Sequence, residues 1–426
     1  MEQKADFAEV LEVASEAGHI LLENGAEISR VEDIMNRIAT HFGVSSGNFF
    51  VLSNGIFTTG KAEKVSEGGG QASTYANVEF IPIRSCQLSR VAAVNRLSYD
   101  IAADKCSLAE ARERLAAIKN SAPKPFWEQM LATTLSTGAF AAVFGGSFLD
   151  CLAASVSGFF LFLFTFFVSA PYLSRIVSGI CNAVVVTGVS TLCWRLGLGE
   201  NLSNIVIGAI MPLIPGIPFV NGVRDLANSD YLAGLTRLTD AMLGFFCIAI
   251  GVALSFILDG GLFGGVIALG LTENSAQTAA AGWQALAAFV GTVGFAVLFG
   301  VEREQYLACG VIGMLGWLLY LALSRYAGFS APISSLFAAF LVCFLSRFMA
   351  VHKRCPAQIF IICGIFPLVP GAGIFWFSYY LTTGVFGMAA SFGFMAVRVA
   401  VCIVLGIILA MELPQRLFSG RKLRTH

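Results

Sequence analysis

The sequence predicts a multi-pass membrane protein with ten transmembrane helices, an all-α 5+5 inverted repeat with broken fourth helices, preceded by a soluble α+β cytoplasmic domain. Three observations predict this fold. Of the 426 residues, 56% are hydrophobic and only 13% are charged, which is too apolar for an ordinary soluble protein. Charge gathers in residues 1–125, which hold 13 of the 27 Lys and Arg and 16 of the 27 Asp and Glu. The apolar remainder contains the motif Pro-Leu-x-Pro-Gly twice, at 212–216 and at 367–371.

The overall charge and the cysteines exclude several classes of protein. The formal net charge is zero and basic runs are missing, whereas a nucleic-acid-binding protein carries a basic balance. The eleven cysteines lie mostly in apolar stretches, without Cys-x-x-Cys spacing. We interpret them as small buried hydrophobic residues and expect neither a metal nor a cofactor. The amino terminus is acidic and amphipathic, so we expect no cleaved signal peptide.

Residues 1–125 are expected to fold as a domain of helices and strands. Apolar residues at helical spacing predict four helices, over 7–23, 29–42, 88–103 and 108–118. Ser29 with Glu32, and Ser107 with Glu110, have the spacing of a helix capping box. Stretches rich in Phe, Val and Ile predict two strands, over 48–58 and 75–83, with the glycines 68–70 in a loop between them.

One compact polar cluster lies at the start of the second predicted helix. It consists of Gly25, Glu27, Arg30 and Glu32. A helix cap with a surface charge pair and a functional site are both open interpretations of this cluster. The glycine-rich stretch lacks the Lys and Ser or Thr of a phosphate-binding loop. His19 and His41 lie on separate helices without a partner at catalytic spacing, and we expect that the chain is not an enzyme.

Ten stretches are apolar enough to cross a bilayer, which takes about 20 mostly apolar residues. They fall at 129–145, 149–169, 173–194, 201–219, 237–258, 283–301, 306–324, 331–350, 357–375 and 390–411. The predicted domains are therefore a cytoplasmic α+β domain (1–125), a first five-helix membrane repeat (126–260), and a second five-helix repeat with a basic cytoplasmic tail (261–426).

The basic residues of the membrane part predict its orientation, because cytoplasmic loops collect Lys and Arg. With the amino terminus inside, eleven of the fourteen basic residues fall on the cytoplasmic side. Arg195 and Arg325 fall outside, and Arg398 lies within the last span. We therefore expect a protein of the plasma (inner) membrane with both termini in the cytoplasm.

The repeated motif predicts two broken helices. Pro215-Gly216 and Pro370-Gly371 are 155 residues apart, and each pair lies in the fourth predicted helix of its group. Proline removes a backbone donor and clashes one turn back, so each pair should interrupt its helix. Since five is odd, the second group enters the membrane from the opposite side, which gives an inverted repeat. Paired breaks point to a transport site, and two unrelated proline kinks are the alternative.

A polar run follows the first break. Its residues are Asn221, Arg224, Asp225, Asp230, Tyr231, Arg237 and Asp240. A half-helix that begins near Pro218 would present free amides to a substrate carboxylate. Arg224 can hold that carboxylate through two hydrogen bonds, and Asp225 can take a proton. A cytoplasmic loop with a surface ion pair is the alternative.

Three further residues are candidates in the membrane part. Tyr379 follows the second break in a polar but uncharged segment, so the two half-sites are not equivalent. Asn182 on the third predicted helix can line the path or serve in helix packing. Arg398 lies some eight positions into the last span, where a basic residue faces a cavity or a partner unless it reaches to the interface.

The residues Gly25-Ala26-Glu27-Ile28-Ser29-Arg30-Val31-Glu32 resemble the amino-terminal signature of the threonine/serine exporter family. Pro215 through Pro218, with Asn221, Arg224-Asp225 and Tyr231, resembles its membrane signature, and 367–371 is similar to its second, smaller membrane module. The resemblance covers nearly the whole chain. Ser378-Tyr379-Tyr380 departs from the Gly- and Tyr-containing pattern expected after the second break.

This resemblance implies a cytoplasmic domain fused to a ten-helix exporter that uses the proton gradient to expel small amino acids. Relatives with the two modules on separate chains are similar to exporters of a C4 dicarboxylate such as succinate. We therefore expect a proton-coupled antiporter for threonine or serine, with succinate export as the alternative and a homo-oligomer compatible with the sequence. A membrane-tethered enzyme or sensor that works through residues 1–125 is a second alternative. Deletion of that domain distinguishes these functions, because an exporter should keep a substrate-dependent flux in its membrane half.

Overall fold

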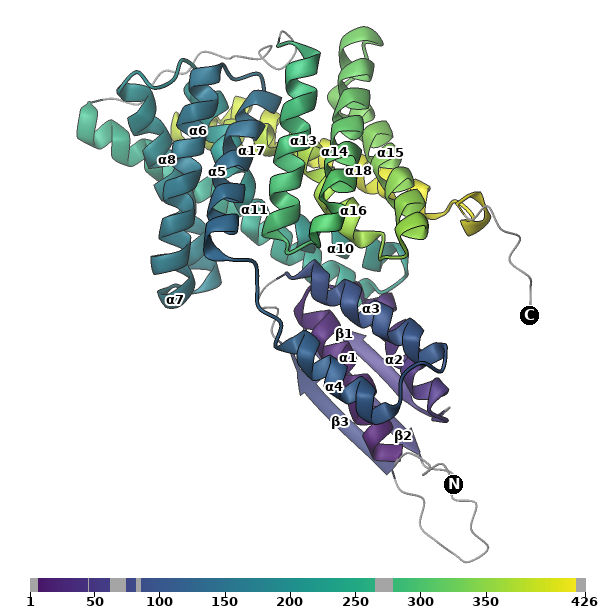
Figure 1. Ribbon diagram of the computed structural model, residues 1–426. Coiled ribbons are helices and arrows are strands. Elements are labelled where there is room, and N and C mark those ends of the chain that lie inside the picture. The colour runs from purple at the N-terminus through teal and green to yellow at the C-terminus, as the bar shows by residue number, and fades with distance from the viewer. Residues whose placement is uncertain (1–6, 45, 62–73, 82–85, 265–278, 419–426) are drawn as a thin grey trace, which may run out of the picture. The chain divides into compact units, whose positions relative to one another are not determined.

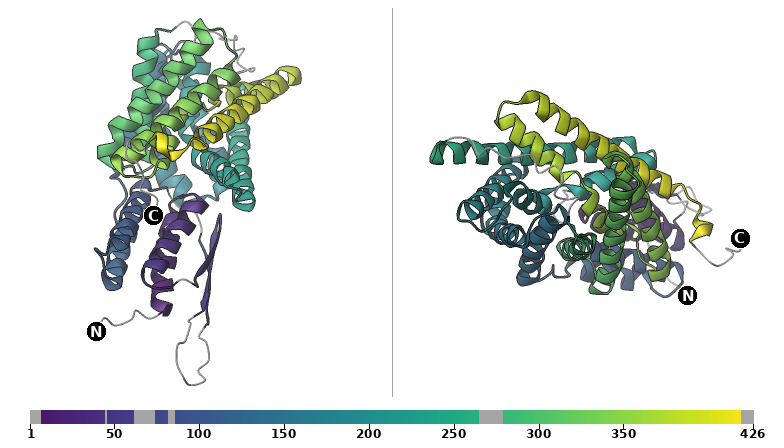
Figure 2. Two further views of the ribbon diagram at one scale, coloured as in Figure 1. Left: turned by 90° about the vertical axis from the view of Figure 1, so that its right-hand side faces the viewer. Right: turned by 90° about the horizontal axis from the view of Figure 1, so that it is seen from above.

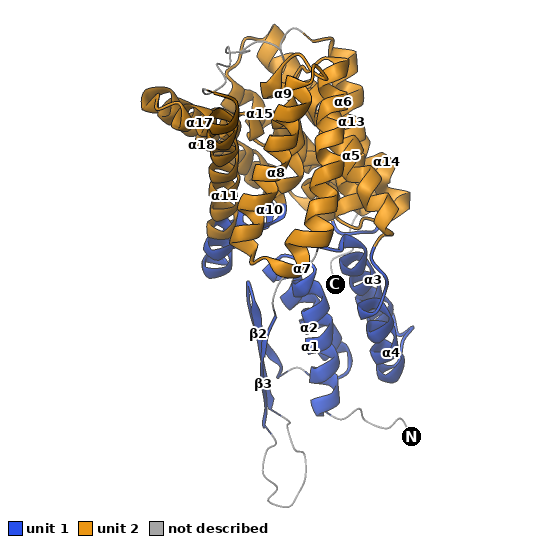
Figure 3. Ribbon diagram, turned by 90° about the vertical axis from the view of Figure 1, so that its left-hand side faces the viewer, with its two compact units in different colours: residues 1–123, 217–238, 354–356 blue, residues 124–216, 239–353, 357–426 orange. Residues whose placement is uncertain are grey.

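The computed structural model describes five stretches of the chain, residues 7–44, 46–61, 74–81, 86–264 and 279–418 (Figure 1). They are mostly helical and contain one three-stranded sheet. The chain divides into two compact units (Figure 3). Unit 1 comprises residues 1–123, 217–238 and 354–356, and unit 2 comprises 124–216, 239–353 and 357–426. Unit 1 thus joins the amino-terminal domain to a segment just after the first Pro-Gly pair. The predicted division at 125 and 260 stays a prediction.

The four helices predicted in the amino-terminal domain are confirmed. They are α1 (Phe7–Glu23), α2 (Ile28–His41), α3 (Leu88–Ala102) and α4 (Leu108–Lys119). Ser107 caps α4 as predicted, since its hydroxyl accepts a hydrogen bond from the Glu110 amide at 3.3 Å. The capping box predicted at Ser29 and Glu32 is wrong. Glu27 is the first residue outside α2, Ser29 lies inside its first turn, and the Glu32 carboxylate instead accepts a hydrogen bond from the Val51 amide at 3.2 Å.

The sheet contains one strand more than predicted. Strands β1 (Asn48–Leu52), β2 (Gly55–Lys61) and β3 (Thr74–Phe80) are antiparallel in the order β1-β2-β3. The single strand predicted over 48–58 is wrong, because the chain reverses at Ser53-Asn54 and pairs Leu52 with Gly55. Asn-Gly at 54–55 is a strong hairpin signal that the Phe- and Val-rich pattern obscured. The strand predicted over 75–83 is confirmed as far as Phe80, and residues 82–83 and the glycine loop at 68–70 lie outside the described residues.

The amino-terminal domain has a single apolar core. Its buried side chains come from one face of each of α1 to α4, packed together and against the sheet, and include Leu11, Ile20, Val31, Ile38 and Leu97. One polar pair lies in this core, where the Ser15 and Thr58 hydroxyls are hydrogen-bonded at 2.9 Å between α1 and β2. Burial of a polar group costs little when it is hydrogen-bonded, so this pair fixes α1 on the strand without weakening the core.

Helices make up most of the described part of unit 2 and of the segment 217–238 of unit 1. In chain order they are α5 (Phe126–Val143), α6 (Phe148–Phe164), α7 (Ala170–Tyr172), α8 (Arg175–Arg195), α9 (Leu202–Ile210), α10 (Gly216–Ala227), α11 (Tyr231–Phe263), α13 (Ala281–Leu298), α14 (Tyr306–Leu321), α15 (Ala331–Lys353), α16 (Gln358–Ile365), α17 (Gly371–Thr382) and α18 (Phe386–Met411). Each of the ten predicted spans falls on one of these helices or on a helix pair. Figure 2 shows them from two further sides.

Seven described helices are long and apolar enough to cross a membrane, and nine spans result if each of two bent helix pairs counts as one. The bent pairs are α9 with α10 and α16 with α17. Helix α5, the first predicted span, is not among the seven, and it carries the polar residues Glu128, Thr133, Ser136 and Thr137. The ten-span arrangement and the inverted repeat therefore remain predictions.

Unit 2 is held together by close helix crossings at small residues. A Cβ atom added to Gly208 of α9 would lie 2.5 Å from the backbone nitrogen of Ala141 on α5. Likewise, a Cβ atom on Gly406 of α18 would lie 2.3 Å from the carbonyl oxygen of Leu336 on α15. Only glycine permits backbones to approach so closely, which is a common way of packing helices in membranes.

Candidate functional site

The first Pro-Gly pair interrupts a helix, as predicted. Helix α9 tightens into a 3-10 turn at Met211–Leu213, Ile214 is extended, and α10 begins at Gly216 after a bend of 60°. The Pro215 ring packs where a Cβ atom on Gly244 of α11 would lie, 2.8 Å away. The chain is therefore fixed at the break by its neighbours, and the break is more than a local kink.

The second pair interrupts its helix in the same way. Helix α16 ends in a 3-10 turn at Phe366–Leu368, and α17 begins at Gly371 after a bend of 44°. The two breaks also meet in unit 2. A Cβ atom on Gly216 would lie 2.5 Å from the Phe366 ring, and one on Gly371 would lie 3.0 Å from the Met211 sulfur. The structure thus brings Pro215-Gly216 and Pro370-Gly371 together, although they are 155 residues apart in sequence.

The segment after the second break is aromatic and buried. The Tyr379 ring lies 5.9 Å from the Phe256 ring and 5.7 Å from the Trp376 ring, in edge contacts. The Ser378 hydroxyl donates to the Ile374 carbonyl within α17. No charged residue lies in α17, so the segment after the second break offers aromatic faces and hydroxyl groups.

The segment after the first break is charged and buried within unit 1. Asp225 is 0% exposed and Arg224 is 5% exposed. The interpretation of these residues as a solvated surface pair is therefore wrong. They are not paired with each other: one Asp225 carboxylate oxygen accepts from Arg237 Nη1 of α11 at 2.6 Å, and the other accepts from the Ile28 amide at 3.1 Å.

Arg224 has an incompletely satisfied guanidinium group. Its Nη2 lies 2.5 Å from a carboxylate oxygen of Glu27, but the angles do not make a hydrogen bond, since that oxygen has no hydrogen-bond partner among the described residues. Arg224 Nε and Nη1 are also buried without a partner in the described part of the chain. Buried donors without an acceptor are costly, so an acceptor added beside these two nitrogens would lower that cost.

Glu27 is the acidic partner of two arginines. Its second carboxylate oxygen accepts from Arg30 Nε at 3.1 Å. Burial alone would raise the pKa of Glu27, but the guanidinium groups of Arg224 and Arg30 outweigh it, so its pKa lies below the usual value. Glu27 therefore stays ionised at neutral pH and supplies a permanent negative charge next to Arg224.

The remaining predicted site residues do not lie together. Asn221 belongs to the charged cluster, because its Nδ2 donates to the Gly25 carbonyl at 2.6 Å. Pro218 lies in the first turn of α10. Asn182 is in α8 of unit 2, where its side chain donates to the Ser178 hydroxyl at 3.4 Å. Arg398 is exposed on α18. Burial raises the pKa of Glu32, which binds the Val51 amide outside the cluster.

Two contributions to the cluster were missed from the sequence. Arg237 belongs to the polar run after the first break but was not predicted as a site residue, yet it is 2% exposed and also donates to the Ala26 carbonyl at 2.8 Å. The turn between α1 and α2 was identified as polar, but its contacts with α10 were not foreseen. The two family-like signatures, 25–32 and 215–231, each carry both acidic and basic residues, so ion pairs between them were one arrangement that the sequence allowed.

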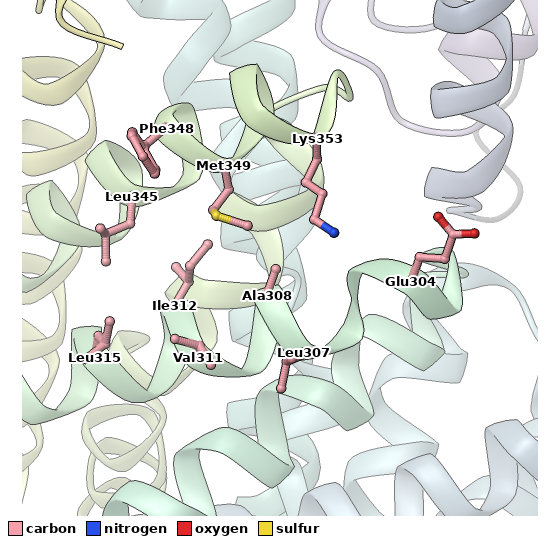
Figure 4. Close-up of a pocket in the computed structure, with 10 residues that line it drawn as sticks. All are labelled: Glu304, Leu307, Ala308, Val311, Ile312, Leu315, Leu345, Phe348, Met349 and Lys353. Atoms are coloured by element: carbon pink, nitrogen blue, oxygen red, sulfur yellow. The ribbon is translucent and has the colours of Figure 1, made fainter. Parts of the chain in front are cut away.

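Two other features are separate from this cluster. An apolar groove of about 360 Å³ runs between α14 and α15, with Glu304 and Lys353 at one end (Figure 4). Among the described residues, groups of three or more His, Cys, Asp or Glu side chains that could hold a metal ion are absent. His19 pairs with Glu79 at 2.6 Å and His41 with Asp104 at 3.3 Å.

Comparison with known proteins decides the family. The family model described as "Putative threonine/serine exporter" matches residues 12–258. The chain belongs to the threonine/serine exporter family. A second model, "Threonine/Serine exporter, ThrE", matches residues 284–412. This family of transporters fits the expectation that the chain is not an enzyme, and together with the apolar helices it makes the chain a multi-pass membrane protein.

Three relatives match this threonine/serine exporter family member over different shares of their length. The "Probable threonine/serine exporter" of Mycobacterium tuberculosis is 25% identical over 304 residues, 68% of this chain and 56% of that relative. The "Threonine/serine exporter" of Corynebacterium glutamicum is 23% identical over 380 residues, 87% of this chain and 75% of the relative. The "Probable succinate transporter subunit YjjP" of Klebsiella aerogenes is 24% identical over 262 residues, 60% of this chain and 96% of the relative. The chain therefore spans little more than half the length of the first of these relatives. No solved structure matches the chain.

Proposed function

We propose that this protein is a secondary active exporter of threonine or serine, coupled to protons and located in the inner membrane with both termini in the cytoplasm. The observation that carries the proposal is Arg224, which is buried just after the first helix break with two nitrogens lacking partners among the described residues. A guanidinium group in that state suits a carboxylate, which accepts two parallel hydrogen bonds.

The neighbouring charges suit the rest of an amino acid. A zwitterionic amino acid needs an anionic group for its ammonium as well as a cation for its carboxylate. Asp225 is a buried carboxylate in the same cluster as Arg224. In this proposal Arg224 binds the substrate carboxylate, Asn221 and Pro218 shape the pocket, and Asp225 takes up the coupled proton.

The two breaks supply the moving parts. Each is a bent helix pair, and the residues of the two breaks pack on each other. Alternating access by an inverted repeat requires paired discontinuous helices around one site. We assign Pro215, Gly216, Pro370 and Gly371 to this hinge region, and Tyr379 to the aromatic segment that follows the second break.

Export of a C4 dicarboxylate is the second candidate. A second buried guanidinium, Arg237, lies in the same cluster as Arg224, and two cations suit two carboxylates. The YjjP relative, named as a succinate transporter subunit, also matches over nearly its full length. Amino-acid export remains the first choice because Arg237 is already neutralised by Asp225.

The test is flux through the purified protein in lipid vesicles with an imposed pH gradient, using labelled threonine, serine and succinate. Arg224→Lys should raise the half-saturating substrate concentration by about tenfold, since loss of one charged hydrogen bond costs about 1.5 kcal/mol. Asp225→Asn should keep substrate exchange but lose accumulation against a gradient. Because that change leaves Arg237 without its carboxylate, the double variant Asp225→Asn with Arg237→Gln is measured beside it.

The matched control is the exposed ion pair Arg175–Asp240, 3.0 Å apart in unit 2. Arg175→Lys and Asp240→Asn make the same chemical changes at the surface and should transport like the wild type. Normal affinity in Arg224→Lys, or normal accumulation in both Asp225 variants, would rule out this site. The proposed function itself fails if none of the three substrates moves.

A further inference from the structure

The turn between α1 and α2 is bound to the segment after the first helix break at five points. Three of them use the backbone of the turn, through the Gly25 carbonyl, the Ala26 carbonyl and the Ile28 amide. The other two use side chains, in the pairs Glu27–Arg224 at 2.5 Å and Ser29–Asn228 at 2.9 Å. The turn therefore covers every charged residue that we assign to the substrate.

Gly25 explains how the turn reaches these partners. Its φ of +80° lies in the left-handed region, which glycine adopts without strain and other residues rarely do. The chain reverses there, so the Ala26 carbonyl reaches Arg237 of α11, and the Ile28 amide and the Glu27 side chain reach α10. The N-cap residue Glu27 makes no side-chain cap hydrogen bond at the amino end of α2. The Asp225 carboxylate binds its first amide instead, which is a favourable place for an anion.

Glu27 carries the same chemical group as the proposed substrate. Its carboxylate is 3% exposed and lies on the arginine that would hold a substrate carboxylate. We propose, on the basis of the function proposed above, that Glu27 is an internal competitor: its carboxylate occupies Arg224 when the site is empty, and the substrate carboxylate displaces it. The turn of residues 25–29 is then a removable cover of the transport site.

The geometry of Arg224 and Glu27 favours such an exchange. The contact between them is an ion pair without a good hydrogen bond, and Arg224 keeps two unused donors among the described residues. A planar substrate carboxylate could use these donors as a pair. When the Glu27 carboxylate leaves Arg224, it keeps Arg30 as a cationic partner, because Arg30 Nε already donates to the other Glu27 carboxylate oxygen at 3.1 Å. Arg30 Nη1 in turn donates to Asn95 Oδ1 at 3.4 Å, and the Arg30 side chain is 24% exposed. The displaced carboxylate is therefore not left as an unpaired buried charge, which would be costly.

Competition makes a quantitative prediction. A ligand's apparent affinity falls in proportion to the fraction of protein whose site is open. If Glu27 occupies Arg224 about nine-tenths of the time, Glu27→Gln should lower the half-saturating substrate concentration about tenfold. Glu27→Asp keeps the charge on a shorter side chain and should give an intermediate value. A role of Glu27 in folding alone would reduce the amount of active protein and leave the half-saturating concentration unchanged.

The matched control is Glu12→Gln, which removes a carboxylate from an exposed pair with Arg112, 2.8 Å away in the same unit. It should leave the half-saturating concentration unchanged. An unchanged or higher half-saturating concentration in folded Glu27→Gln protein would overturn the competitor role. A wild-type protein that transports none of the three substrates would instead overturn the proposed function, so the two failures are distinguishable.

A second variant tests the cover if Glu27→Gln does not fold. Ser29→Cys with Asn228→Cys places two thiols where the wild-type side chains are hydrogen-bonded. A short, reducible bifunctional thiol reagent should join them, stop transport, and release it again on reduction. The control Glu9→Cys with Arg112→Cys replaces an exposed pair between α1 and α4 and should transport normally with the same reagent. Full transport in the Ser29–Asn228 cross-linked protein would refute the cover.

Discussion

The Asp225–Arg237 pair allows a sharp test of the charge cluster in unit 1. Both side chains are almost fully buried, and the two joined atoms are 2.6 Å apart. Removal of one member of a buried pair typically costs about 3–5 kcal/mol, because the other charge is left uncompensated. Asp225→Asn and Arg237→Gln should each lower the free energy of unfolding by about 3 kcal/mol.

The double variant should be more stable than either single variant. With both charges gone, the two amide side chains still form a neutral hydrogen bond, and the net loss should be only about 1–2 kcal/mol. The coupling energy between the two positions should therefore be about 4–5 kcal/mol. For the exposed pair Arg175–Asp240 the same cycle should give about 0.2–1 kcal/mol.

Unfolding of the purified protein by sodium dodecyl sulfate in mixed micelles, followed by tryptophan fluorescence and circular dichroism, measures these four free energies. The two probes must give coincident transitions before a single free energy is used. Additive losses in the double variant would refute the reasoning, since they would mean that the two side chains do not compensate each other in the folded protein.

Three further predictions follow from other parts of the structure. Pro215→Ala should restore the helix between α9 and α10 and abolish transport, while membrane insertion, measured by protease protection, stays normal. The double change with Gly216→Ala is less clean, because a Cβ atom there meets the Phe366 ring at 2.5 Å. Full flux in Pro215→Ala would contradict a role of the break in transport. Gly208→Val should lower the free energy of unfolding by about 1–3 kcal/mol, because the larger side chain overpacks against Ala141. The control Gly261→Val should be nearly neutral, because a Cβ atom at Gly261 meets nothing within 4 Å. Equal losses of thermal stability in the two variants would show that the close crossing of α5 and α9 does not matter. The pKa of Glu27 lies below its ordinary value of 4.5 in the folded protein, so its contribution to stability is present above about pH 4.5 and is lost as the pH falls through the folded pKa. Acid unfolding curves should show this loss of stability in the wild type and a shallower loss in Glu27→Gln. Identical pH dependence of the two proteins would contradict this role of Glu27.

Local chemistry made part of this fold predictable from the sequence. Proline removes a hydrogen bond and clashes within one helical turn, so the positions of Pro215-Gly216 and Pro370-Gly371 located both helix interruptions to the residue. Helix α1 could be assigned from Phe7 to Glu23 because its apolar spacing is regular. The hairpin at Asn54-Gly55 was missed although its signal is equally local, because the β-rich composition on both sides suggested one continuous strand.

Long-range contacts account for what could not be predicted. Glu27 and Arg224 are separated by almost half the chain, and neither helical spacing nor composition records which distant residue a charge will meet. The cluster could be recognised as two polar signatures, but their contact and the participation of Arg237 follow only from the folded arrangement of α2, α10 and α11. The burial of Asp225 was likewise invisible, since a polar run beside a broken helix has the same composition whether it lies in a loop or in a core.

The interface between α5 and α13 has a consequence for how the gene can be divided. These helices belong to different family-model matches, residues 12–258 and 284–412, yet they pack together in unit 2 through the Phe140 and Phe295 rings and through Gln284, which donates to the Val143 carbonyl at 2.8 Å. A peptide link between the halves then mainly raises their effective concentration. Two separate polypeptides, cut between α11 and α13 and produced in the same cell, should find each other through this surface, and covalent fusion would serve to keep the halves in equal numbers.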